Sequence, residues 1–400
     1  MKKNFLKRAC AASLLFAGVF SSHAMAGTDD GSIISDAGVE KPHFRTSVYV
    51  REGYDDNAET SNNNQVTSGY TSFGINEFAD FGSDRSILTI GVQLGANYYY
   101  SQPGQKFDWT DNLSLNYTYK LNERLTLSLA SYAAYQVEPQ YDLLVAQNRV
   151  NGQYFYFTDV LSASYQWTRR FSTITNYTLD GIFYQDAAPK VTNDYVAQTF
   201  GNQFRFLALP TTTLVAEYRF GIVNYLYQSG NNSITNYFLT GFDHTFNPKL
   251  LTTLRVGAEI QDQNVGGIST SPYAEWSVNY AYQHLSSLGY YLRYGFDYSN
   301  LTVAQTDKAL RTGININHGF SPKLTATLGI FYQHDDYSNS GGTPGTAFTE
   351  NTIDIQTGLQ YAMTPRLSLN ASYTYTDLLS NNSLLEYHRS TVSIGANYGF

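Results

Sequence analysis

Few residues in this 400-residue chain are arranged as metal-binding groups. Asp55, Asp56 and Asn57 stand together at the end of a predicted strand, and carboxylate and amide oxygens of this kind can bind Ca²⁺. Asp335 and Asp336 stand at the end of another predicted strand. The alternative interpretation of both groups is a solvated start of a loop, and we favour it. We therefore expect no bound metal and no cofactor.

Candidate catalytic residues are equally sparse. His244 and His318 occur in the similar segments DHTFNPK and NHGFSPK beside predicted tight turns, where a polar residue of the membrane interface is a simpler explanation than catalysis. His334 near Ser338 is the only faint candidate for a Ser–His hydrolase site. The sequence contains no phosphate-binding loop, zinc-ligand spacing or nucleotide-binding fingerprint. We expect that the protein is not an enzyme.

The composition indicates which structure carries these residues. Charged residues are 14% of the chain and aromatic residues 16%, with 35 Tyr and 31 Gly. A helical membrane protein needs an apolar run of about 20 residues, and none is present. One Cys excludes a disulfide scaffold, and the net charge of −8 argues against binding to nucleic acid. What remains is the composition of a transmembrane β-barrel.

The N-terminus has the pattern of a secretion signal. Positively charged residues precede a short apolar stretch, and Ala24-Met25-Ala26 supplies the small residues of a cleavage site. We predict a signal peptide at 1–26, export by the Sec pathway with removal of that peptide, a short periplasmic leader at 27–43 and a barrel at 44–400.

Alternation of apolar and polar residues with period two predicts the strands. Leu324, Ala326 and Leu328, for example, alternate with Thr325 and Thr327. A two-sheet sandwich alternates in the same way, so the connections must decide. Tight turns recur at 122–124, 168–170, 209–211, 247–249, 285–286, 321–323 and 364–366. Longer polar segments join the other strand ends, at 138–152, 185–193, 228–233 and 338–350.

Short turns on one side and long loops on the other are typical of an outer-membrane barrel. The fold class we predict is all-β, a transmembrane antiparallel up-and-down β-barrel. The count is about 18 strands, with 16 as the alternative. Among them we place strands at 250–263 and 271–282, with a loop between.

One parity of the strands carries the charges and the other is apolar. Charges facing lipid cost about 2–4 kcal/mol each near the bilayer midplane for Arg, so the charged parity is assigned to a water-filled lumen. A barrel of 18 strands is too wide for side chains to fill, which leaves a channel. The segments 138–152 and 338–350 are candidates to fold inward and narrow it. The predicted lumen-lining residues are Arg51, Arg205, Glu217, Arg219, Arg255, Glu259, Glu275, Arg293, Asp297, Arg311 and Asp354.

Aromatic residues on the apolar parity gather near both ends of the predicted strands, as two interfacial girdles would require. Those beside the short turns are Tyr117, Tyr119, Trp167, Phe206, Phe246, Tyr280, Tyr282, Phe320 and Tyr361. Those beside the long loops are Tyr98, Tyr135, Phe183, Tyr298, Tyr332 and Tyr375.

The C-terminal strand has a specific pattern. Gly395, Tyr398 and the terminal Phe400 resemble the signal that the bacterial outer-membrane assembly machinery reads. The opening strand, TSVYVREGYDDN at 46–57, resembles the start of the putative beta-barrel porin 2 family. The resemblance implies a signal-peptide-bearing outer-membrane barrel that acts as a pore or an export conduit, sometimes alongside exopolysaccharide machinery.

We therefore expect an outer-membrane porin-like channel for passive diffusion of small hydrophilic solutes. The alternatives are a conduit or partner in exopolysaccharide export and a non-conducting structural barrel. Expected partners are outer-membrane lipid and lipopolysaccharide, the assembly machinery, and small hydrophilic solutes or saccharides, with no nucleic acid. The sequence leaves solute identity, pore radius and oligomeric state open.

Overall fold

The structure is a computed structural model. It describes residues 43–102, 106–136, 153–185, 194–298, 306–338, 348–381 and 386–400. The predicted signal peptide and nearly all of the predicted leader lie outside the described residues. So do the segment 138–152 and most of the segments 185–193 and 338–350.

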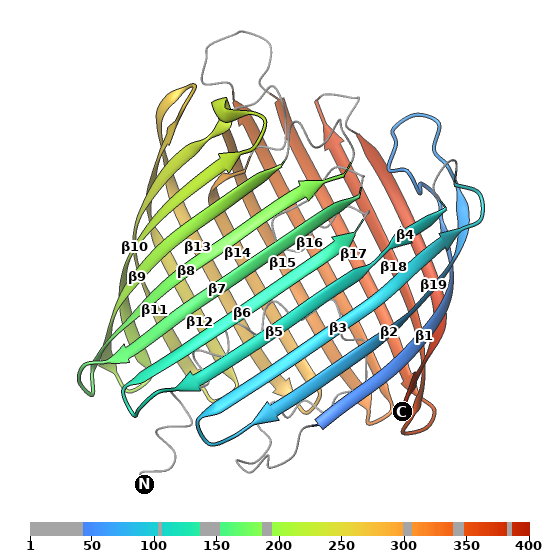
Figure 1. The fold of residues 1–400 in the computed structure, drawn as a ribbon, viewed down its shortest axis with the longest axis horizontal. Coiled ribbons are helices and arrows are strands. Elements are labelled where there is room, and N and C mark those ends of the chain that lie inside the picture. Colours follow the sequence, from blue (N-terminus) through green and yellow to red (C-terminus); the bar gives the residue numbers. More distant parts are fainter. Residues whose placement is uncertain are drawn as a thin grey trace.

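The described chain forms one closed antiparallel sheet, in which strands adjacent in sequence are paired (Figure 1). Its strands are β1 (His43–Asp55), β2 (Ser68–Gly82), β3 (Ser86–Tyr99), β4 (Phe107–Trp109), β5 (Asp111–Lys120), β6 (Leu125–Gln136), β7 (Tyr154–Gln166), β8 (Phe171–Tyr184), β9 (Tyr195–Leu209), β10 (Thr212–Tyr225), β11 (Ser233–Asn247), β12 (Leu250–Gln263), β13 (Gly267–Gln283), β14 (Ser286–Asp297), β15 (Thr306–Ser321), β16 (Leu324–Ser338), β17 (Phe348–Ala362), β18 (Leu367–Ser380) and β19 (Tyr387–Gly399). One short 3-10 helix, η2 (Ser229–Asn231), lies between β10 and β11.

Eighteen strands make up the wall. The segments β4 and β5 both pair with β3 and are separated by Thr110 alone, so they are two parts of one strand. The last strand, β19, pairs with the first, β1, from Ser47 opposite Gly399 to Asp55 opposite Thr391. Closure leaves no strand edge there for lipid to contact. The prediction of an 18-stranded antiparallel barrel is confirmed, and the alternative of 16 strands is wrong.

Two kinds of connection define the two ends of the barrel. At the turn rim, where β1 begins and β19 ends, two to four residues join consecutive strands. Side-chain oxygens at the starts of these turns accept backbone N–H groups. Asn122 Oδ1, for example, accepts from Arg124 and Leu125 at 2.8 and 2.9 Å. Thr168, Asn247, Ser321 and Thr364 act in the same way. This local bonding explains why the turns predicted from sequence form.

The opposite end, the loop rim, carries the longer connections, with one exception. Only residues 264–266 join β12 to β13, and β13 begins at Gly267 rather than at the predicted 271. Gly266 and Gly267 have φ angles of 129° and 76°, which glycine adopts at no steric cost. The predicted loop was wrong because these two glycines form a tight hairpin turn there.

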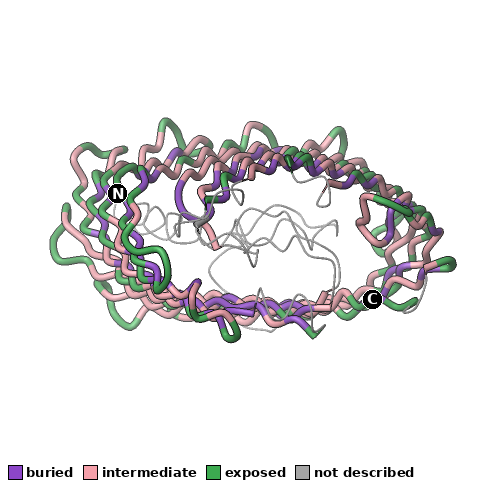
Figure 2. Tube along the Cα trace, turned by 90° about the horizontal axis from the view of Figure 1, so that it is seen from above, coloured by how far each residue is buried: buried purple, intermediate pink, exposed green. Residues whose placement is uncertain are grey.

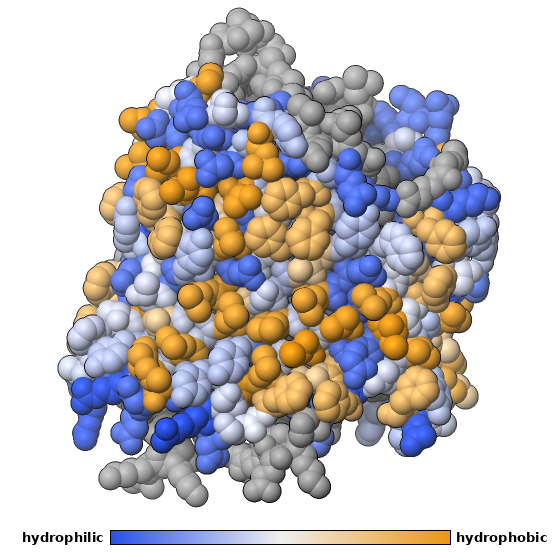
Figure 3. All heavy atoms as spheres, in the orientation of Figure 1, coloured by the Kyte–Doolittle hydropathy of each residue, from blue (hydrophilic) through white to orange (hydrophobic). Residues whose placement is uncertain are grey.

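On the side of the barrel seen in Figure 3, apolar residues cover much of the middle and polar residues gather toward both rims. Exposed large apolar side chains occur on most strands of the wall. His244 and His318 lie within the turn-rim girdle, with ring centroids 4.3 and 4.5 Å from those of Phe246 and Phe320. The described part of the chain contains no helix that is long and apolar enough to cross a membrane.

Seen along its axis, the wall is an elongated ring (Figure 2). Buried residues lie mostly on its inner side, and some of the described backbone turns inward from the wall.

Candidate functional site

The inner face of the wall is the candidate site. All eleven sequence-predicted lumen residues lie on the strand parity that also carries the buried residues, opposite the exposed apolar parity. Among them Glu217, Arg255, Glu259, Arg311 and Asp354 are buried. Because a buried charge is tolerated only when it is paired or hydrogen-bonded, their partners decide what the face can do.

Five of the eleven, together with Asp243, form one network across β9–β13, which we call the β9–β13 charge network. Arg255 lies at its centre, with Nη1 2.8 Å from Asp243 and Nε 3.4 Å from Glu217. Arg205 pairs with the same Asp243. The alternation of signs continues on the other side. In order, the network runs Arg205, Asp243, Arg255, Glu217, Arg219 and Glu275.

The far end of this network is held by a tyrosine. Arg219 Nε is 2.6 Å from Glu217, and its two terminal nitrogens are 3.0 and 2.9 Å from the carboxylate of Glu275. Tyr273 accepts from Arg219 Nη1 at 3.1 Å and donates to Glu275. Two nearly parallel N–H···O bonds fix the guanidinium as a rigid fork. The result is a mixed-charge strip with fixed geometry on one side of the interior.

Next to this network two arginines face each other. Arg293 on β14 is in register with Glu275 on β13 and with Arg311 on β15. Like charges directly opposite destabilise a sheet, and Asp297 relieves this contact because it pairs with both arginines.

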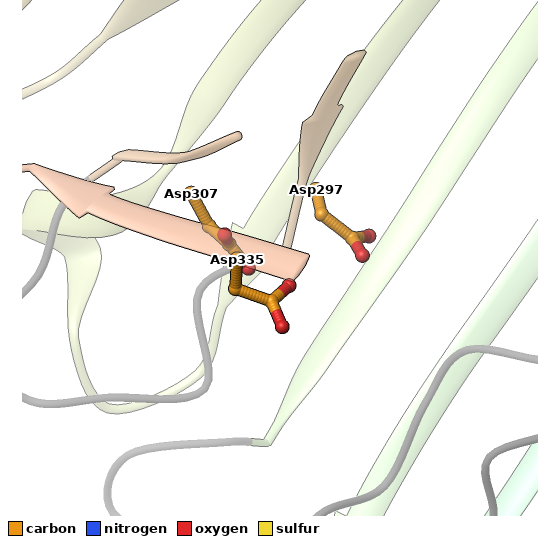
Figure 4. A group of neighbouring side chains, drawn as sticks. All are labelled: Asp297, Asp307 and Asp335. Atoms are coloured by element: carbon orange, nitrogen blue, oxygen red, sulfur yellow. The ribbon is translucent and has the colours of Figure 1, made fainter. Parts of the chain in front are cut away.

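A second cluster consists of Asp297, Asp307 and Asp335, from three neighbouring strands (Figure 4). One carboxylate oxygen of each lies within 4.8 Å of the others. Arg311 supplies a positive charge to Asp297, and Gln333 donates to Asp335 at 2.6 Å. The sequence did not predict Asp307, because only the register between strands brings it beside Asp297.

The structure separates Asp335 from its chain neighbour. Asp335 is fully buried on the inner parity, whereas Asp336 is exposed on the outer parity. The solvated-loop interpretation was therefore wrong for Asp335. Consecutive residues of a strand point to opposite faces, so these two carboxylates cannot bind one ion.

The residues 55–57 have a structural role at the junction of β1 and β19, which we call the seam. The guanidinium of Arg389 binds both carboxylate oxygens of Asp55, at 3.1 Å from Nε. Asn57 donates its backbone N–H to Asp55 at 2.9 Å and its side-chain amide to the carbonyls of Ser61 and His388 at 2.9 Å. Asp55 and Asn57 are fully buried, so the prediction of a solvated loop was wrong here as well.

Asp56 and Gly395 also take part in the contacts of the seam. Asp56 accepts the N–H of Ser390 at 2.6 Å and donates its own to the carbonyl of that residue at 3.2 Å. Gly395 lies opposite Arg51 in register, and a Cβ atom there would be 2.4 Å from Arg51 Cγ. Gly395 therefore makes room for Arg51, which also lies 4.6 Å from the ring of Tyr49. This packing explains why glycine, one of the predicted signal residues, is present at position 395.

Other sequence candidates lie apart from the inner face. His334 has the outer parity and bonds to Asn351 Oδ1 at 2.9 Å, an acceptor that it shares with Tyr332. Tyr398 and Phe400 lie outward, with ring centroids 5.3 Å apart.

The predicted position of Tyr298 was wrong. We predicted it for the outer girdle at the loop rim, but its ring lies 4.9 Å from that of Tyr195, which faces inward from β9. Tyr298 packs against a buried cluster on the inner face of β7–β10. The prediction was wrong because it assumed that β14 stays paired with β13 as far as that residue, whereas this pairing ends at Tyr294.

The sequence of the last strands matches a family model. Residues 308–400 match the model of the putative beta-barrel porin 2 family. The predicted resemblance is thereby confirmed, on the C-terminal strands of this porin-type barrel rather than on the opening strand. No curated protein matches the sequence.

Solved structures of similar shape include three porins. OpdK of Pseudomonas aeruginosa, solved with vanillate, has a TM-score of 0.48 and 9% identity over 89% of this chain and 99% of its own. OccK2 of the same organism, solved with glucuronate, has a TM-score of 0.46 and 10% identity over 89% and 96%. A BenF-like porin from Pseudomonas fluorescens Pf-5 has a TM-score of 0.48 and 9% identity over 89% and 99%.

The closed sheet, its apolar outer belt and the porin-type family match place the protein in the bacterial outer membrane.

Proposed function

We propose that the protein is a passive outer-membrane channel for small hydrophilic solutes and has no enzymatic activity. The observation that carries the proposal is the contrast between the two faces. The outer face is apolar, whereas the inner face carries the β9–β13 charge network and the cluster around Asp297. So many charged side chains are stable inside a barrel when water fills the remaining space, because water lowers the desolvation cost of each charge. A lumen of that kind admits hydrophilic solutes of either charge.

The test is the conductance of refolded protein in a planar lipid bilayer. We expect stepwise insertion events, each adding a constant ohmic conductance. A refolded barrel that shows heat-modifiable migration but passes no current would contradict the proposal and favour a non-conducting structural barrel.

Tyrosine rings that line a lumen can stack on sugar rings, but the buried tyrosines of this barrel do not support export of a polysaccharide. Those of the β7–β10 cluster, such as Tyr154, Tyr156 and Tyr195, are 2–3% exposed and pack against one another, so their ring faces are not available to stack on sugars. Loss of exported polymer on gene deletion, with unchanged solute uptake, would nevertheless favour that function over ours.

We further propose that the assembly machinery reads Gly395, Tyr398 and Phe400. The outward position of the two aromatic rings supports this role, because an outward ring is accessible to a partner before the barrel closes.

A further inference from the structure

The wall is interrupted between β13 and β14 near the loop rim. These strands pair from the turn rim only as far as Ala274 opposite Tyr294. Beyond that point residues 267–273 of β13 still pair with β12, but none of the described strands pairs with their other side. Pro272 lies in this stretch, and a residue without an N–H group suits a strand edge.

Beyond Tyr294, β14 remains paired with β15 as far as Asp297 opposite Asp307, but it separates from β13 and passes to the inner side of that strand. The Cα of Gly295 lies against two inward-facing side chains, since a Cβ atom there would be 2.6 Å from Glu259 Oε1 and 2.7 Å from Tyr273 Cδ2. Phe296 donates its backbone N–H to Glu259. The parity of β14 would put Phe296 on the outer face, but it is only 3% exposed. Lys308 of β15 lies against its ring, 5.7 Å from the centroid, so this ring is covered rather than exposed to lipid.

At Tyr298 the chain still lies on the inner side of the wall. Its ring contacts Tyr195 of β9, which is separated from β14 in the sheet by β10–β13. The described residues 295–298, which we call the inward end of β14, thus contact inward-facing side chains of β9, β12 and β13. Asp297 in this segment faces Arg293 and Arg311.

We propose that the inward end of β14 forms the constriction of the channel and that Gly295 is the residue that permits it. The inference rests on the proposed channel function and adds the place where solute size is selected. A second layer of backbone inside the wall narrows the lumen at this height. Any side chain at position 295 would collide with Glu259 and Tyr273 and push the segment away from the wall or back into register with β13.

A cross-linking experiment tests the geometry without reference to conduction. The only Cys in the sequence is Cys10, within the predicted signal peptide, so introduced cysteines report alone. In intact outer membranes, the Tyr195→Cys/Tyr298→Cys variant should cross-link with a short bifunctional thiol reagent. The matched control Tyr195→Cys/Tyr294→Cys should not, because Tyr294 is still paired with β13 in the wall. Folded barrels whose single cysteines react at both 195 and 298 but do not cross-link would overturn the inference.

The functional test uses two glycines of the same strand. Gly295→Val should raise the single-channel conductance and admit larger uncharged solutes in liposome-swelling assays. Gly289→Val is the control, because the nearest atom to a Cβ there is Asn279 Oδ1 at 3.8 Å. If Gly295→Val lowers the yield of folded barrel, Glu259→Ala replaces it, since it removes the acceptor of the Phe296 N–H.

The two failures are distinguishable. A wild-type barrel that conducts while Gly295→Val and Glu259→Ala keep its conductance and size limit would overturn the inference and leave the channel function intact. A wild-type barrel that passes no current would refute the channel function, whatever the cross-linking shows.

Discussion

Two junctions between strands of the wall differ in how far the paired strands stay hydrogen-bonded to each other. At the seam, β1 and β19 pair over nine consecutive positions, and the buried Arg389–Asp55 pair lies at the end of the ladder. Between β13 and β14, pairing stops at Ala274, and β14 passes behind its neighbour. The seam joins residues 334 positions apart, which no short turn connects. The β13–β14 junction is tied covalently by a two-residue turn at the other rim, so it can open at one end without loss of closure.

The largest effect is expected from breaking the seam. Arg389→Ala leaves the fully buried Asp55 carboxylate without its guanidinium, and loss of one partner of a buried pair costs about 3–5 kcal/mol. We expect a large loss of heat-modifiable barrel from the outer membrane. Arg45→Ala is the control at the other end of β1. Its pair with Asp80 is 41% and 36% exposed and contributes about 0–1 kcal/mol. Equal yields of the two variants would contradict the role of the seam.

A smaller effect on assembly is expected at the end of β19. Replacing Phe400 by Ser removes an outward aromatic ring at the chain terminus, and we expect a reduced yield of folded barrel. Phe44→Ser is the matched control, because Phe44 is also outward and exposed near the same rim but lies in the first strand. An unchanged yield for Phe400→Ser would count against the assembly signal.

Ion selectivity should respond to charges near the β13–β14 junction more than to those at the seam. Neutralising Arg219, Arg255 and Arg293 removes three positive charges and leaves their carboxylate partners. We expect the reversal potential in a salt gradient to shift toward cations. Arg51→Gln near the seam should shift it less. An unchanged reversal potential in the triple variant would argue against a lumenal position of these arginines.

The smallest effect is expected at the open end of β13. Gly267 has a φ angle of 76°, and no atom lies within 4 Å of the position that a Cβ would take there. Gly267→Ala therefore carries backbone strain alone, about 1 kcal/mol. We expect a slight decrease in the urea midpoint of unfolding in detergent. A decrease as large as that of Arg389→Ala would mean that this end of β13 is as important for closure as the seam.

The sequence predicts most of the wall because local chemistry specifies it. Alternation assigns Glu217 and Arg219 to one face, and residues such as Asn122 and Thr168 close the turns through their own side chains. Neither requires knowledge of distant residues.

What the sequence does not reveal depends on long-range register or on a local break. Arg389 is distant in sequence from Asp55, and Asp307 meets Asp297 only through pairing of their strands. Tyr298 keeps the parity of its strand, but the strand is no longer paired with β13 beyond Tyr294, and the ring lies against Tyr195. The presence of glycine at position 295 does not predict that β14 separates from β13. Other strands of this chain contain glycine for different reasons; Gly395, for example, makes room for Arg51.

The most direct test of the account is the current through single refolded barrels in a planar bilayer, because it asks whether water fills the space that the wall encloses. We predict discrete conductance steps that grow with salt concentration and become larger in the Gly295→Val variant. Folded, inserted wild-type protein that leaves the bilayer insulating at every salt concentration would contradict it.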